Sequence, residues 1–150
     1  MAKIPARVLQ VEQNRGEAIR AGAEAEVASV LASWGLQRMA ASPWAAAALQ
    51  KAIVQRRCWR PERFDLTAGK REMLRMPRQA ARSGGDCDDW TLFCGLAWRV
   101  LTGADPFGCR WLPSIEKAEH VCLEAMPGVT IDVAPGAPES WGEQGEVTLW

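Results

Sequence analysis

Apolar residues occupy almost every side of the stretch from residue 87 to residue 101. Its polar residues gather in the first turn and at Arg99, while leucine, phenylalanine and valine are spread around the rest of the axis. A helix that is apolar on nearly all sides is a buried one. Ser83 or Asp86 can cap its start, and Gly103 supplies a stop after it. The pattern therefore predicts a buried central helix around which the rest of the chain is organised.

Two more helices are predicted before the central one. In residues 17–36, alanine, valine and leucine recur at helical spacing among glutamates. Ser42 and Pro43 then form the start signal of a second helix, which runs to about Arg57. Residues 1–16 are polar, so we expect an irregular arm or a short strand there.

After the central helix the period of the apolar residues changes to two, which indicates strands. Residues 108–112 are one strand candidate. Residues 119–125 alternate between polar and apolar side chains, and Pro127 and Gly128 turn that run into residues 129–133. The pattern predicts an antiparallel hairpin.

The C-terminal residues add a Pro- and Gly-rich loop over 134–145 and an expected last strand over 147–150. Helices followed by an antiparallel sheet give an α+β fold. A chain of 150 residues with 48% hydrophobic content can bury a core without disulfides, so we expect a single domain.

Net charge gives no general drive toward nucleic acid or membrane, because 18 basic residues balance 18 acidic ones. The basic residues concentrate between Arg56 and Arg82, but acidic residues lie among them, so we expect no nucleic-acid binding. No apolar run approaches the roughly 20 residues of a membrane span. The first residues lack the apolar segment of a signal peptide, so we expect reduced thiols.

The five cysteines form no CxxC pair, which indicates neither a disulfide framework nor a zinc ribbon, and no cofactor is expected. Cys94, Cys109 and Cys122 resemble small buried side chains. Cys87 differs, because it lies at the start of the central helix, where the positive end of the helix dipole favours a thiolate. Three neighbouring aspartates oppose a thiolate, so a nucleophilic Cys87 needs a cation beside it.

The only histidine, His120, lies on the first strand of the predicted hairpin. A turn near Pro127 sets it roughly opposite Asp132, and a carboxylate can hold one ring nitrogen and orient the other. If the sheet packs over the helix start, Cys87, His120 and Asp132 form a nucleophile, a base and an orienting group. A purely structural histidine is the alternative.

Several of these features occur together in one known family. Gly-Asp-Cys-Asp-Asp at residues 85–89 opens an apolar helix, Glu124 follows His120 by four residues, and an apolar strand leads to Asp132. Residues 72–77 fit a Glu-x-apolar-Arg-x-Pro segment before the cysteine motif. In these respects the chain resembles the transglutaminase-like superfamily, and in particular its short bacterial and phage-encoded members.

The resemblance implies a papain-like core, in which the helix that bears the cysteine packs on a small antiparallel sheet. It divides the single domain of residues 1–150 into a helical N-terminal extension over 1–41, a core over 42–135 and a C-terminal tail over 136–150.

The function that the resemblance implies is cysteine-dependent acyl transfer by a triad of Cys87, His120 and Asp132. The reaction would be hydrolysis of a peptide or isopeptide amide, or exchange of a Gln amide. The expected partners are a protein or peptide substrate and phage structural proteins. The expected location is the bacterial cytoplasm or a virion.

Two other functions stay open. The same fold can serve as a non-enzymatic structural or assembly component of a phage particle. Alternatively, Cys87, His120, Asp132 and Cys122 can be considered as ligands of a metal ion, although a cysteine among three carboxylates is not the usual setting for zinc.

We predict that Cys87 reacts with iodoacetamide before the other four cysteines, and at a lower pH than a free thiol does, because of its place at the helix start. Limited labelling followed by mass spectrometry measures this order. Equal labelling of all five thiols would remove Cys87 as the nucleophile.

Overall fold

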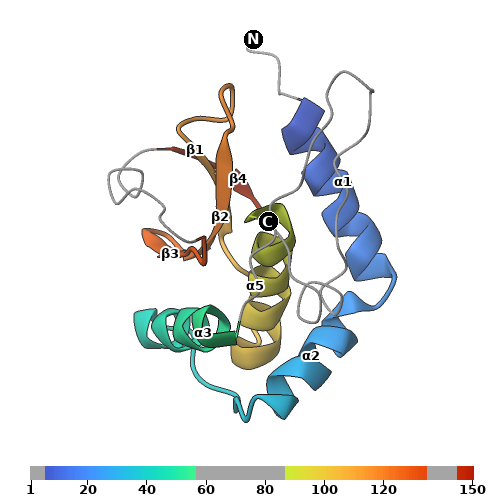
Figure 1. Ribbon diagram of the computed structural model, residues 1–150, viewed down its shortest axis with the longest axis vertical. Coiled ribbons are helices and arrows are strands. Elements are labelled where there is room, and N and C mark those ends of the chain that lie inside the picture. Colours follow the sequence, from blue (N-terminus) through green and yellow to red (C-terminus); the bar gives the residue numbers. More distant parts are fainter. Residues whose placement is uncertain (1–5, 57–86, 135–144) are drawn as a thin grey trace.

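Four helices come before four strands in the residues that the computed structural model describes, which are 6–56, 87–134 and 145–150 (Figure 1). The helices are α1 (Ala6–Arg20), α2 (Ala23–Ser33), α3 (Pro43–Arg56) and α5 (Cys87–Thr102). The strands are β1 (Gly108–Leu112), β2 (His120–Met126), β3 (Val129–Ile131) and β4 (Glu146–Leu149). None of these helices is both long enough and apolar enough to cross a membrane.

The strands form one antiparallel sheet in the order β3-β2-β1-β4. The predicted hairpin is confirmed: β2 and β3 pair on either side of Gly128, whose φ of 79° favours glycine. Within it Leu123 lies opposite Ile131, and an irregularity follows at Met126. Together with the helices before it, this sheet confirms the α+β class.

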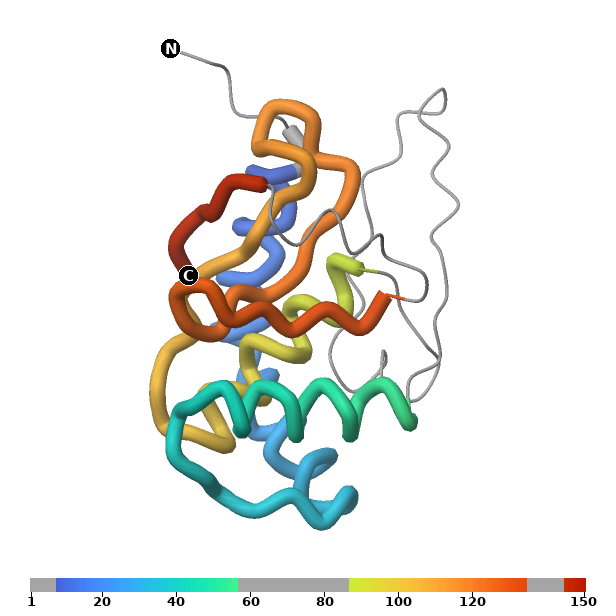
Figure 2. The backbone as a smooth tube through the Cα atoms, turned by 90° about the vertical axis from the view of Figure 1, so that its left-hand side faces the viewer, coloured from blue at the N-terminus to red at the C-terminus, as the bar shows by residue number. Residues whose placement is uncertain are grey.

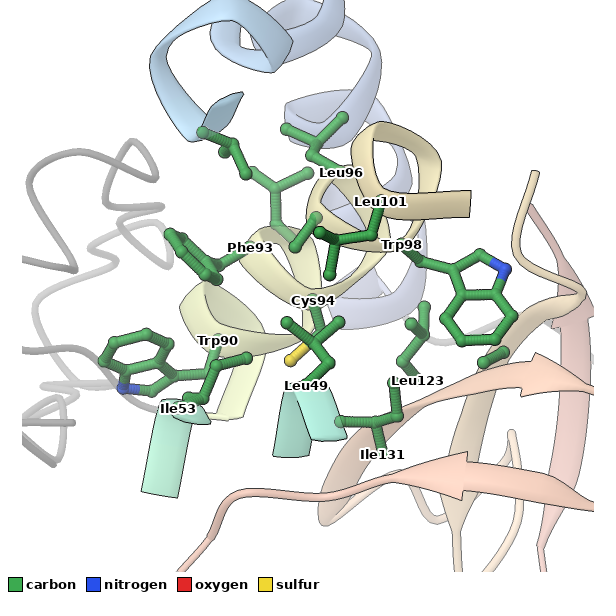
Figure 3. Close-up of a cluster of buried hydrophobic side chains, with 14 of the residues drawn as sticks. Leu49, Ile53, Trp90, Phe93, Cys94, Leu96, Trp98, Leu101, Leu123 and Ile131 are labelled. Carbon is green, nitrogen blue, oxygen red and sulfur yellow. The ribbon is translucent and has the colours of Figure 1, made fainter. Parts of the chain in front are cut away.

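The helix α5 is the buried centre of the fold, as its sequence predicts. Phe93, Leu96 and Trp98 have no exposed surface. Figure 3 shows residues of α3 and of the β2–β3 hairpin gathered around α5, and α2 packs against it as well. The helix ends before Gly103, which takes the left-handed conformation with φ 72°.

The prediction of an irregular segment before residue 17 is wrong. Over the described residues, this stretch forms the first part of α1. Its buried residues Val8 and Val11 pack with Cys109 and Trp111 of β1 in a second apolar cluster. Two valines are too weak a periodic signal in a polar stretch, so it is the contact with the sheet that accounts for this helix.

The single helix predicted over residues 17–36 is also wrong. The chain breaks at Gly22, which has φ 81°, and α2 then starts at Ala23 and ends at Ser33. A left-handed residue cannot continue an α-helix, so two shorter helices result.

The helix α3 begins where Ser42 and Pro43 predict, and the Ser42 hydroxyl accepts a hydrogen bond from the Ala45 N–H at 3.2 Å. It lies alongside the β3 segment, as Figure 2 shows, and packs on both β3 and α5. The candidate caps of α5, the basic segment after residue 56, the segment at 72–77 and most of the loop at 134–145 lie outside the described residues.

We predict opposite effects of alanine at two helical glycines. A Cβ at Gly95 would overlap the ring of Trp150, whereas a Cβ at Gly16 would meet only the flexible Arg20 side chain, at 3.3 Å. Gly95→Ala should therefore lower the free energy of unfolding by about 1–3 kcal/mol. Gly16→Ala, the matched control, should raise it by about 0.5–1 kcal/mol. Urea denaturation measures both free energies of unfolding, and equal changes in the two variants would contradict the described position of the Trp150 ring.

Candidate active site

Cys87 is the first residue of α5, and its side chain is half-buried. Its Sγ lies 3.7 Å from Oδ1 of Asp88, and the side chain also packs against the apolar cluster between α1 and the sheet. The positive end of the helix dipole acts at this position, while the adjacent carboxylate opposes it.

His120 is the first residue of β2 and lies between Cys87 and Asp132. Its Nε2 lies 2.8 Å from Oδ2 of Asp132, and the ring also makes a side-chain hydrogen bond with Cys87. The contact with Cys87 places the ring beside the thiol, so the imidazole links the two side chains. The side chain of His120 is 9% exposed, so the imidazole itself is nearly buried.

Asp132 follows the last residue of β3 and is held at three points. Its Oδ2 meets His120, its Oδ1 accepts the N–H of Ala134 at 3.0 Å, and its own N–H donates to Oε1 of Gln50 at 3.2 Å. A quarter of its side chain is exposed.

The hairpin register differs by two residues from the one that the sequence suggests. Extending the pairs of β2 and β3 past Ile131 sets Asp132 opposite Cys122 rather than His120. The histidine and the carboxylate are therefore diagonal neighbours across the hairpin. Diagonal side chains two residues apart still share a face and can touch.

The pKa of His120 reflects opposed effects. Burial lowers it, but the hydrogen bonds to Asp132 and Cys87 and the negative charges of both groups raise it, with a net result of about 9 instead of 6.5. Because the pKa lies above neutrality, His120 is an imidazolium at neutral pH and loses its proton only as the pH rises past about 9. A nucleophilic thiolate at Cys87 would need such a cation beside it.

A shallow hollow that is partly open to solvent adjoins these residues. Its lining includes Cys87, Trp90, Cys122 and Asp132. Cys87 and Asp132 therefore share the lining of one hollow.

The other described cysteines are poor candidates for the nucleophile. Cys94, Cys109 and Cys122 are buried, as predicted. Burial is the main cause that raises the pKa of each thiol, to about 11 for Cys109 and beyond that for Cys94 and Cys122. Such groups stay protonated at neutral pH, which leaves Cys87 as the accessible thiol of the described residues.

Glu124, a further residue of the sequence pattern, has a different partner. Glu124 accepts a hydrogen bond from Nε of Arg110 at 2.8 Å and forms a buried ion pair with it, so it is a structural residue of the sheet.

No three metal-binding side chains come together in residues 6–56, 87–134 and 145–150. His120 stands between Cys87 and Asp132 and hydrogen-bonds each, so the three side chains do not converge on one point.

Sequence reasoning did not find Gln50. It lies 82 positions before Asp132, on a helix that the sequence marks only as a packing element, and no motif links the two residues. The structure alone reveals this contact.

Comparison with protein-family models, curated proteins and solved structures gives no match. The resemblance to the transglutaminase-like superfamily therefore rests on the sequence motif alone. The assigned roles of Cys87, His120 and Asp132 rest on chemistry and on the contacts described above.

We predict that histidine NMR will give a pKa of about 9 for His120, the chain's one histidine. Asp132→Asn should lower this pKa, because it removes a negative charge while keeping a similar shape. Asp105→Asn, which removes an exposed carboxylate at the far end of α5, is the control and should leave the pKa unchanged. A wild-type value near 6.5 would contradict the described contacts.

Proposed function

We propose that the chain is a cysteine-dependent acyl-transfer enzyme of transglutaminase or papain-like type, acting on an amide of a protein or peptide. One observation supports it above all others. A single imidazole hydrogen-bonds both the thiol at the start of a buried helix and the carboxylate of Asp132, a residue that Ala134 and Gln50 also hydrogen-bond. This is the arrangement that nucleophilic catalysis by a weak acid requires.

In the first step, the Cys87 sulfur attacks the carbonyl carbon of the amide, and a C–S bond forms. The negative charge moves to the carbonyl oxygen, for which the Cys87 backbone N–H is the candidate donor. When the intermediate collapses, the C–N bond breaks and His120 gives its proton to the leaving amine. The products are an amine and a thioester on Cys87.

In the second step, neutral His120 takes a proton from water or from a primary amine, which attacks the thioester carbon. The C–S bond breaks, and the thiolate and the imidazolium are restored. Water gives a carboxylic acid and an amine gives a new amide, so the acceptor alone decides between hydrolysis and amide exchange.

The proposed role of Asp132 is to hold the ring in one orientation and to favour its charged form. Its hydrogen bond with Nε2 directs the other ring nitrogen toward Cys87. This assigns the carboxylate to His120 and not to the substrate.

We predict that an activated acyl ester forms a thioester on Cys87, visible as an added acyl mass on the peptide that contains this residue. Cys87→Ser should abolish this adduct, and His120→Ala should slow its formation by about 10²–10⁴-fold through loss of proton transfer. Cys109→Ala, which removes a buried thiol that does not line the hollow beside Cys87, is the control and should acylate like wild type.

Acylation of folded wild-type protein at random cysteines, or at Cys87 equally well without His120, would sink this proposal. The non-enzymatic role in a phage particle would then be the better account. A Gln-containing protein and a fluorescent primary amine, added together, distinguish amide exchange from hydrolysis.

A further inference from the structure

Gln50 makes the one described contact between the side chains of α3 and the backbone of Asp132. Its Oε1 accepts the Asp132 N–H at 3.2 Å, and its side chain is half-buried. The β2–β3 ladder ends at Ile131, so the next N–H along the chain has passed beyond the strand pairs. The amide oxygen of Gln50 accepts the hydrogen bond that a backbone carbonyl of a neighbouring strand would otherwise accept.

This bond restrains the carboxylate as well as the backbone. The Ala134 N–H holds Oδ1 of Asp132 at 3.0 Å, which leaves Oδ2 to meet His120 at 2.8 Å. Both contacts depend on where the Asp132 backbone lies and how it is turned. Gln50 fixes that backbone from a helix that is packed on both β3 and α5.

We propose that Gln50 is a positioning residue of the site, whose amide oxygen holds the backbone of Asp132 so that the carboxylate meets His120. The inference rests on the proposed function, because it gives α3 a part in setting the charge of His120. Gln50 itself touches neither the thiol nor the ring in any described contact.

A merely structural hydrogen bond between α3 and the hairpin is the alternative. The pKa of His120 distinguishes these two explanations. Asp132 and Cys87 are the charged groups that raise the pKa of His120. Gln50 is neutral, so removing its acceptor can change that pKa only by moving Asp132. A structural bond affects stability and leaves the pKa where it is.

The experiment compares three variants by histidine NMR and by amide hydrogen exchange. Gln50→Met keeps the side-chain length and helix propensity but removes the acceptor. Gln55→Met makes the same change at an exposed position of α3 and is the matched control. Gln50→Glu keeps an acceptor for the Asp132 N–H and should keep that amide protected.

We expect Gln50→Met to expose the Asp132 amide to exchange, to bring the His120 pKa below about 9, and to slow acylation of Cys87 by about 10–100-fold. Gln55→Met should match wild type in amide exchange at Asp132, in the pKa of His120 and in the acylation rate of Cys87. An unchanged His120 pKa in Gln50→Met, unchanged protection of the Asp132 amide, or a protein that no longer folds would each overturn the inference. Failure of wild-type protein to acylate would end the proposed function instead, and the His120 comparison would still decide the role of Gln50.

Discussion

The packing of α5 against β2 determines where the candidate site lies. One turn after Cys87, the hydroxyl of Thr91 donates to the backbone carbonyl of Val121 at 3.2 Å, and both residues are buried. Val121 is next to His120 along β2. This hydrogen bond therefore holds the first turn of α5 close to the first residue of β2. Because α5 is enclosed by α2, α3 and the sheet, the helix cannot shift without opening the core.

The second constraint is the charge of His120, which lies between Cys87 and Asp132. A buried imidazole would ordinarily lose its proton, yet the pKa of His120 rises to about 9 because Asp132 and Cys87 outweigh the effect of burial. Cations and anions that share a small, nearly dry space stabilise each other strongly and tolerate little displacement. Asp132 has several hydrogen bonds, including one from Gln50 on a separate helix.

Strong local patterns predicted the α+β class, the buried α5, the hairpin and the three residues of the candidate site. Tertiary contacts decided the rest. The helix α1 depends on two valines that meet the sheet, and the left-handed Gly22 divides what reads as one helix. The register of the hairpin depends on an irregularity at Met126, which no turn motif announces. Gln50 was beyond prediction, because only the folded chain brings it to Asp132.

The central claim is that His120 is the cation that stabilises a thiolate at Cys87. The ultraviolet absorbance of a thiolate tests it directly, by comparing wild type with Cys87→Ser at neutral pH. The account predicts a thiolate band in wild type that is absent from Cys87→Ser, is lost in folded His120→Ala, and persists in Cys109→Ala. A band that is absent from wild type, or that survives unchanged without His120, would contradict the account.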